Sequence, residues 1–158
     1  MKKLFLLAFA LIGFAFSGSS QNVADNAIGL RMGDSDGFGA EISYQRGLDT
    51  NRRLEFDLGW RSGNDYDAFK LVGLYQWVMH LDGGFNWYVG AGGGIGSWDS
   101  DIIGSDDGTY LFVAGDIGIE YDFEIPLLIS LDFRPELGFS DFNDDLDFDI
   151  ALGIRYQF

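Results

Sequence analysis

The last twelve residues, DFDIALGIRYQF, alternate strictly between apolar and polar or small side chains. One set of alternate positions holds Phe148, Ile150, Leu152, Ile154, Tyr156 and Phe158. Successive side chains of a β-strand point to opposite faces, so this spacing predicts a strand with one apolar face and one polar face. Such a strand fits two kinds of barrel: one that hides its apolar face from water, and one that turns it toward lipid.

The same alternation recurs seven more times along the chain, which predicts eight strands. Their apolar faces run through residues 28–32, 38–44, 54–60, 69–77, 85–95, 111–121, 129–137 and 146–158. The opposite faces carry Arg31, Glu41, Glu55, Asp57, Arg61, Lys70, Asp116, Glu120, Asp132, Arg134, Glu136, Asp147, Asp149 and Arg155. All remaining charged residues beyond the first residues are assigned to the N-terminal end or to a connection, such as the stretch 46–53. No apolar face therefore contains a charge.

Three features favour a membrane barrel over a soluble barrel or sandwich. A segment such as 146–158 is long enough, tilted, to cross an apolar layer of ~25 Å. The connections near 46–53, 80–84 and 122–126 are short, whereas 97–108 and 139–145 are longer, as in barrels with short periplasmic turns and longer outer loops. Aromatic residues gather at the predicted strand ends, where they would form interfacial girdles. The expected fold is therefore all-β: an eight-stranded antiparallel up-and-down transmembrane β-barrel.

The N-terminus has the layout of a cleaved signal peptide. Lys2 and Lys3 precede a 13-residue apolar run, Leu4–Phe16, and then small residues from Ser17 onward. That run is too short to span a bilayer as a helix. We expect residues 1–20 to be the signal peptide and residues 21–158 to be the barrel domain.

The final strand resembles the C-terminal assembly signal of outer-membrane barrels from Gram-negative bacteria. The resemblance lies in Phe158 at the terminus, Tyr156 third from the end, and the alternating Ile154 and Leu152. The stretches WYVGAGGGIG (87–96) and LDFRPELG (131–138) are similar to strands of small eight-stranded barrels of the OmpA/OmpX type. The resemblance implies an outer-membrane location, contact with membrane lipid and lipopolysaccharide, and insertion by the barrel-assembly machinery. It does not specify a function.

The predicted interior contains nine carboxylates and five cationic groups. Because eight strands leave room only for side chains, we expect these groups to form an ion-pair network that plugs the lumen. The protein would then be a monomer with a structural or surface-interaction role. A small cation-preferring pore is the alternative, since acids are in excess. We expect the inward glycines of Gly90–Gly96 to make room for bulky neighbours such as Phe112.

Catalysis, cofactors and nucleic acid find little support in the sequence. The single histidine, His80, lies near a predicted periplasmic turn and lacks the partners found in lipid-modifying barrel enzymes, so an enzyme is the less favoured alternative and no cofactor is expected. The net charge of −15 disfavours binding to nucleic acid. Acidic outer loops could bind divalent cations weakly through Asp99, Asp101, Asp106, Asp107, Asp141, Asp144 and Asp145, although their spacing matches no EF-hand.

Overall fold

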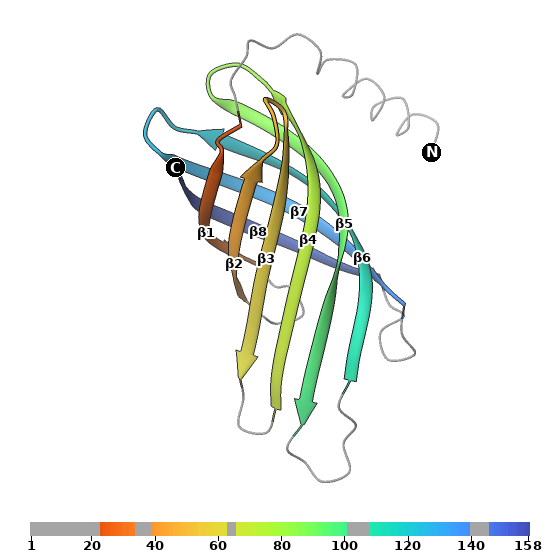
Figure 1. The fold of residues 1–158 in the computed structure, drawn as a ribbon. Coiled ribbons are helices and arrows are strands. Elements are labelled where there is room, and N and C mark those ends of the chain that lie inside the picture. The colour runs from red at the N-terminus through yellow and green to blue at the C-terminus, as the bar shows by residue number, and fades with distance from the viewer. Residues whose placement is uncertain (1–22, 34–38, 63–65, 101–107, 140–145) are drawn as a thin grey trace, which may run out of the picture.

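The structure, a computed structural model, describes residues 23–33, 39–62, 66–100, 108–139 and 146–158, which form a closed barrel of eight strands in sequence order (Figure 1). The strands are β1 (Asn26–Met32), β2 (Ala40–Gly47), β3 (Arg52–Ser62), β4 (Tyr66–His80), β5 (Phe85–Ser100), β6 (Gly108–Asp122), β7 (Leu127–Gly138) and β8 (Leu146–Gln157). All neighbours are antiparallel, and β1 closes the barrel against β8, with Ile28 opposite Tyr156. The predicted fold class is confirmed; the predicted signal peptide, residues 1–20, lies outside the described residues.

Short turns join the strands at one end of the barrel, the turn end, which is also where β1 begins and β8 ends. These turns are residues 48–51, 81–84 and 123–126, and there the backbone of Phe158 exchanges hydrogen bonds of 2.9 and 3.2 Å with that of Asn26. Gly83 and Gly84 adopt φ angles of 67° and 85°, a region that favours glycine, which allows the tight turn before β5. Among the described residues, no helix is long and apolar enough to cross a membrane.

The first turn is shorter than the sequence pattern predicts. β2 continues to Gly47 and β3 begins at Arg52, because the amide of Leu48 donates to the carbonyl of Arg52 at 2.8 Å and closes a compact turn. Arg46, Arg52 and Arg53 therefore lie in strands, and assigning 46–53 to a connection is wrong. Strands also extend further than expected at the opposite end, since β5 runs to Ser100 before the next connection begins.

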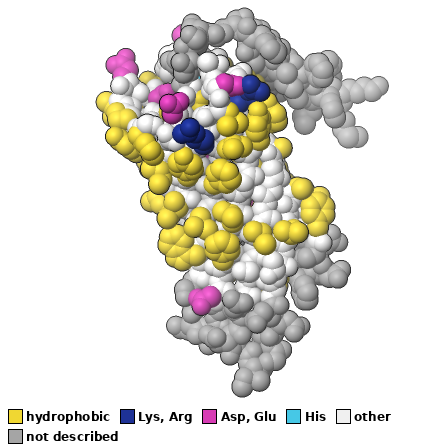
Figure 2. Space-filling model, viewed as in Figure 1, with side chains coloured by type: hydrophobic (Ala, Val, Ile, Leu, Met, Phe, Trp, Pro, Cys, Tyr) yellow, Lys and Arg dark blue, Asp and Glu magenta, His cyan; other side chains and the backbone are white. Residues whose placement is uncertain are grey.

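The wall of the barrel is turned inside out relative to a water-soluble protein. Outward positions such as Ile150 and Leu111 are 64% and 60% exposed, whereas the inward Arg134 and Lys70 are 0% exposed. Figure 2 shows outward apolar side chains spread across the visible face of the barrel as a belt. Because a soluble protein rarely exposes a continuous apolar surface of this kind, the soluble alternative with apolar faces inward is wrong.

Aromatic side chains mark both edges of this belt. Ring pairs lie at the turn end: Tyr75 with Trp77 and Phe85 with Tyr121, both with centroids 4.7 Å apart. Outward-facing Trp60 and Phe69 lie toward the opposite end of β3 and β4. Tyrosine and tryptophan favour the membrane–water interface, where one edge of the ring is apolar and the other is hydrated.

Candidate functional site: the charged lumen

The lumen of the barrel contains a network of buried charges, and Arg31 on β1 is its first centre. Its guanidinium donates to Asp132 on β7 (3.0 Å from Nε), to Glu41 on β2 (3.0 Å) and to Asp149 on β8 (2.5 Å). All four side chains are buried. One arginine therefore connects four consecutive strands around the closure of the barrel.

Arg134 on β7 is the second centre, and it reaches across the lumen. Its guanidinium pairs with Glu41 at 3.4 Å, with Glu55 at 3.3 Å and also with Asp57 on β3. Glu41 therefore joins the Arg31 and Arg134 groups into one network. Because β7 is not a neighbour of β2 or β3, these contacts brace opposite walls.

Arg155 on β8 extends the network toward the turn end. It donates to the hydroxyls of Ser43 and Ser130 at 2.9 and 2.8 Å, and its Nη2 lies 3.2 Å from Oε1 of Glu55. Glu55 also accepts a hydrogen bond from Gln45 at 2.5 Å. A buried charge is tolerated only when paired and hydrogen-bonded, and each of these groups meets that condition.

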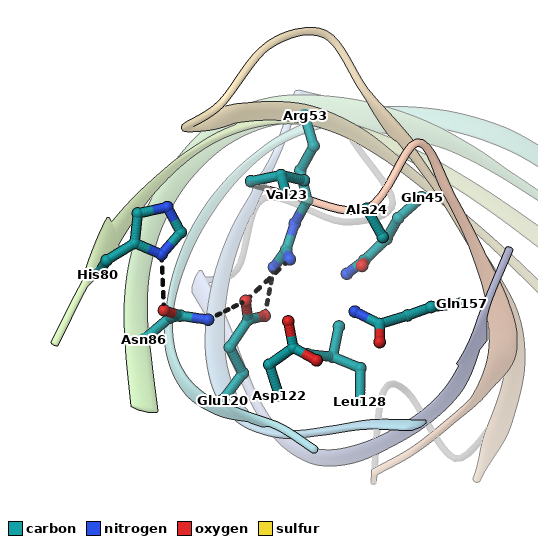
Figure 3. A pocket seen from close by; sticks show the side chains of 10 residues that line it. All are labelled: Val23, Ala24, Gln45, Arg53, His80, Asn86, Glu120, Asp122, Leu128 and Gln157. Atoms are coloured by element: carbon teal, nitrogen blue, oxygen red, sulfur yellow. Dashed lines mark hydrogen bonds and ion pairs between the residues drawn. The ribbon is translucent and has the colours of Figure 1, made fainter. Parts of the chain in front are cut away.

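Arg53 anchors a separate group at the turn end, shown in Figure 3. It donates twice to Glu120 on β6, at 3.1 and 2.7 Å, and its Nε donates to Gln76 at 2.6 Å. Asn86 donates to the same Glu120 at 3.3 Å and contacts Nδ1 of His80 at 2.8 Å. A guanidinium with two bonds to one carboxylate is a strong and geometrically specific pair.

A small cavity lies beside this group. It has a volume of about 10 Å³, the room of a single water. Its lining consists of Val23, Ala24, Gln45, Arg53, His80, Asn86, Glu120, Asp122, Leu128 and Gln157 (Figure 3). The space is polar but too small for a substrate, so it offers no room for catalysis.

The other half of the lumen combines one ion pair with an apolar cluster. Nζ of Lys70 lies 2.6 Å from Oε2 of Glu136 and 5.1 Å from the centre of the Phe112 ring. The cluster consists of Val72, Leu74, Tyr110, Phe112 and Ala114, with Trp98 packed against it. The ion-pair network therefore occupies only part of the interior, and the apolar cluster around Phe112 occupies another part.

The inward glycines of β5 make room for this cluster, as predicted. A Cβ atom at Gly94 would lie 2.3 Å from the Phe112 ring, and one at Gly96 would lie 2.3 Å from the Tyr110 ring. Trp98 lies on β5 with its ring centre 5.6 Å from that of Tyr110, so assigning residues 97–100 to the connection 97–108 is wrong.

Carboxylates outnumber cations in the described lumen. Eight carboxylates and five cations are buried there. Asp116 accepts a hydrogen bond from Gln76 at 2.5 Å. Several other polar atoms make no hydrogen bond to described protein groups: the second oxygen of Asp116, one oxygen each of Asp57 and Asp132, and the Tyr88 hydroxyl. The lumen therefore has an acidic balance even after its ion pairs are counted.

Most of the residues expected in the lumen lie there, with two differences at the rim. Arg61 is exposed at the outer end of β3, and Asp147 is half-buried at the start of β8, because both positions lie where the wall opens. Arg53 was assigned to a connection and is instead buried. Its position two residues before Glu55, on the same face of one strand, is the signal that would have placed it.

The residues proposed for weak cation binding belong to the acidic connections at the other end of the barrel and are almost all outside the described residues. Asp101, Asp106, Asp107, Asp141, Asp144 and Asp145 lie outside the described residues, and only the backbone of Asp99 is described, within β5. Within the described ranges, no group of three or more histidine, cysteine or acidic residues could hold a metal ion.

The architecture is that of a transmembrane β-barrel, and comparison with known proteins agrees at the level of fold. No protein-family model matches the sequence, and no curated protein sequence matches it. The N-terminal β-barrel domain of Pseudomonas aeruginosa OprF is similar in structure, with a TM-score of 0.71 at 14% identity, over 87% of this chain and 100% of that domain.

Two further structures have the same fold. Yersinia pestis Ail, the attachment invasion locus protein, gives a TM-score of 0.60 at 17% identity, over 84% of this chain and 96% of its own. Neisserial surface protein A gives 0.57 at 12% identity, over 84% and 94%. Ail is described as an outer membrane protein. The chain thus has the fold of the small eight-stranded outer-membrane β-barrels.

Proposed function

We propose that this protein is an integral outer-membrane β-barrel of a Gram-negative bacterium, with a structural or surface-interaction role and a lumen plugged by its ion-pair network. One observation carries the proposal: every strand presents apolar side chains outward, while the buried charges lie in the interior. A lipid exterior accounts for this distribution, because open water would disfavour the belt and hydrocarbon would disfavour the charges.

The plug is supported by contacts that cross the barrel. Arg134 pairs with residues of β2 and β3, and Arg53 pairs with Glu120 of β6, so side chains from opposite walls meet inside. An eight-stranded barrel has an interior just wide enough for side chains to fill. A continuous water path would require several of these pairs to separate.

The proposed partners follow from the same arrangement. Membrane lipid and lipopolysaccharide would contact the belt, and the assembly machinery would read the terminal strand through Phe158, Tyr156, Ile154 and Leu152, which are exposed on its outward face. We propose a monomer, a non-enzymatic role and no cofactor.

The second candidate function is a small cation-preferring pore. The excess of buried carboxylates over cations favours it, because an acidic path attracts cations.

The test is insertion of the mature chain, residues 21–158, into phospholipid vesicles. We expect the unboiled protein to migrate differently from the boiled protein on a denaturing gel, and its strands to resist protease in vesicles. A chain that stays in the aqueous phase and is fully digested would overturn the proposal.

A further inference from the structure

Among the described strand residues, the outward, lipid-facing side of the barrel carries cations near the turn end. Arg46 on β2 is exposed and Arg52, the first residue of β3, is 49% exposed. Arg46 lies opposite Leu54, two residues along β3 from Arg52, so the arginines are diagonal neighbours on one face, a spacing of about 7–8 Å. Figure 2 shows cationic side chains at the upper edge of the apolar belt, beside acidic ones.

Aromatic rings surround these arginines. Arg52 lies opposite Trp77 on β4, and the Tyr75 side chain is among the groups that interact with its guanidinium. Tyr44, two residues before Arg46, donates to Oδ1 of Asn26 at 2.8 Å. The arginines therefore lie within the aromatic edge of the belt, at the depth of lipid headgroups rather than in hydrocarbon.

Arg46 has no carboxylate partner among the described residues. Its guanidinium donates to Oδ1 of Asn26 at 2.8 Å, an uncharged acceptor that Tyr44 also uses. Arg52, by contrast, pairs with Asp49. Arg46 thus keeps an uncompensated charge and further donors, beside a second arginine, on a surface that faces lipid.

We propose that Arg46, with Arg52 beside it, binds the phosphate of a phospholipid headgroup in the leaflet at the turn end. An arginine presents a planar set of donors that matches phosphate, and an anion between the two guanidinium groups would remove their mutual repulsion. The acyl chains of that lipid would lie along the belt below. This inference depends on the proposed membrane location.

The test is native mass spectrometry of the refolded mature chain in a sugar-headgroup detergent, titrated with phosphatidylglycerol. We expect the wild type to retain a bound lipid, and Arg46→Gln and Arg46→Gln/Arg52→Gln to weaken retention at least about tenfold. Arg61→Gln is the matched control, because it removes the same charge from the opposite end of β3. A diacyl galactolipid, which lacks phosphate, should bind equally to all variants.

Equal phosphatidylglycerol retention by the wild type and the double variant would overturn the inference, and so would an equal loss in Arg61→Gln or an Arg46 requirement for the galactolipid. The gel shift of each variant reports folding separately. A wild-type chain that fails to enter vesicles would instead contradict the proposed function.

Discussion

Arg53 and Glu120 meet across the lumen from strands that are not neighbours, joined by two hydrogen bonds of 3.1 and 2.7 Å. Both side chains are 2% exposed. The pair braces β3 against β6 near the mouth at the turn end, where the cavity of Figure 3 is lined by the same two residues.

Breaking this pair from one side should be costly. We expect Glu120→Gln and Arg53→Met each to lower the free energy of unfolding by about 3–5 kcal/mol, because each leaves a buried charge without its partner. The double variant should lose less than the sum of the two. Urea unfolding in vesicles measures all three, and Arg52→Met, at an exposed neighbouring position, should cost less than about 1 kcal/mol. Purely additive losses would contradict direct pairing.

Position 96 is predicted to require glycine because the Tyr110 ring packs against it. The three atoms nearest to an added Cβ would be two ring carbons and the hydroxyl oxygen of Tyr110, at 2.3–2.5 Å. We expect Gly96→Ala to lower the free energy of unfolding by about 1–3 kcal/mol through overpacking, and Tyr110→Ala added to it to remove that penalty relative to Tyr110→Ala alone. The control is Gly73→Ala, whose Cβ would lie at an ordinary 3.6 Å from Phe56. An equal penalty at both glycines would contradict the packing account.

The terminal aromatic residue should affect assembly rather than stability. The Phe158 ring is 62% exposed and stacks on Tyr156 with centroids 6.3 Å apart, so its removal leaves the lumen contacts intact. We expect Phe158→Ala to slow appearance of the heat-modifiable form in pulse-chase labelling of cells, with an unchanged unfolding midpoint once folded. Ile125→Ala, which removes a residue of 60% exposure at the same end, is the control. Normal assembly of Phe158→Ala would remove the support for an assembly signal.

One surface carboxylate, that of Asp49, makes a pH-dependent contribution to the stability of the fold. Hydrogen bonds from the Arg52 side chain and the Asn51 amide lower the pKa of Asp49 in the turn below its usual value. A carboxyl whose pKa is lower in the folded state stabilises the fold above its unfolded pKa of about 4, and that stabilisation is lost as pH falls through the folded pKa. Wild type should therefore be slightly more stable than Asp49→Asn near neutral pH, and the difference should vanish in acid. A difference that persists in acid would contradict this origin.

The alternation of apolar and polar residues was sufficient to predict the eight strands and their order. It worked best in β8, where each inward position except Ala151 and Gly153 is charged or polar. In β4 both faces are largely apolar, with Val72 and Leu74 inward and Leu71 outward, so only Lys70 and Gln76 distinguished the faces. Arg46 was misplaced because the sequence does not show that the first turn closes within residues 48–51.

The pairing inside the lumen could not be predicted from sequence. Arg134 meets Glu55 and Asp57 because the strands are tilted and staggered around the barrel, and this relation joins residues 77–79 positions apart. The alternation predicts that these side chains all face the interior. Their positions along the barrel axis, however, depend on the register of every intervening pair of strands. For the same reason, the contact between Lys70 and Phe112 could not be predicted from the sequence.

The most direct test of the central claim is conductance across a planar bilayer that contains the refolded chain 21–158, with the gel shift confirming that the same sample is folded. The plugged barrel predicts no stable conductance steps from wild-type protein, and openings only when Arg134 or Arg53 is replaced by a small neutral residue. Stable, cation-selective steps from the folded wild type would contradict the plug and favour the pore.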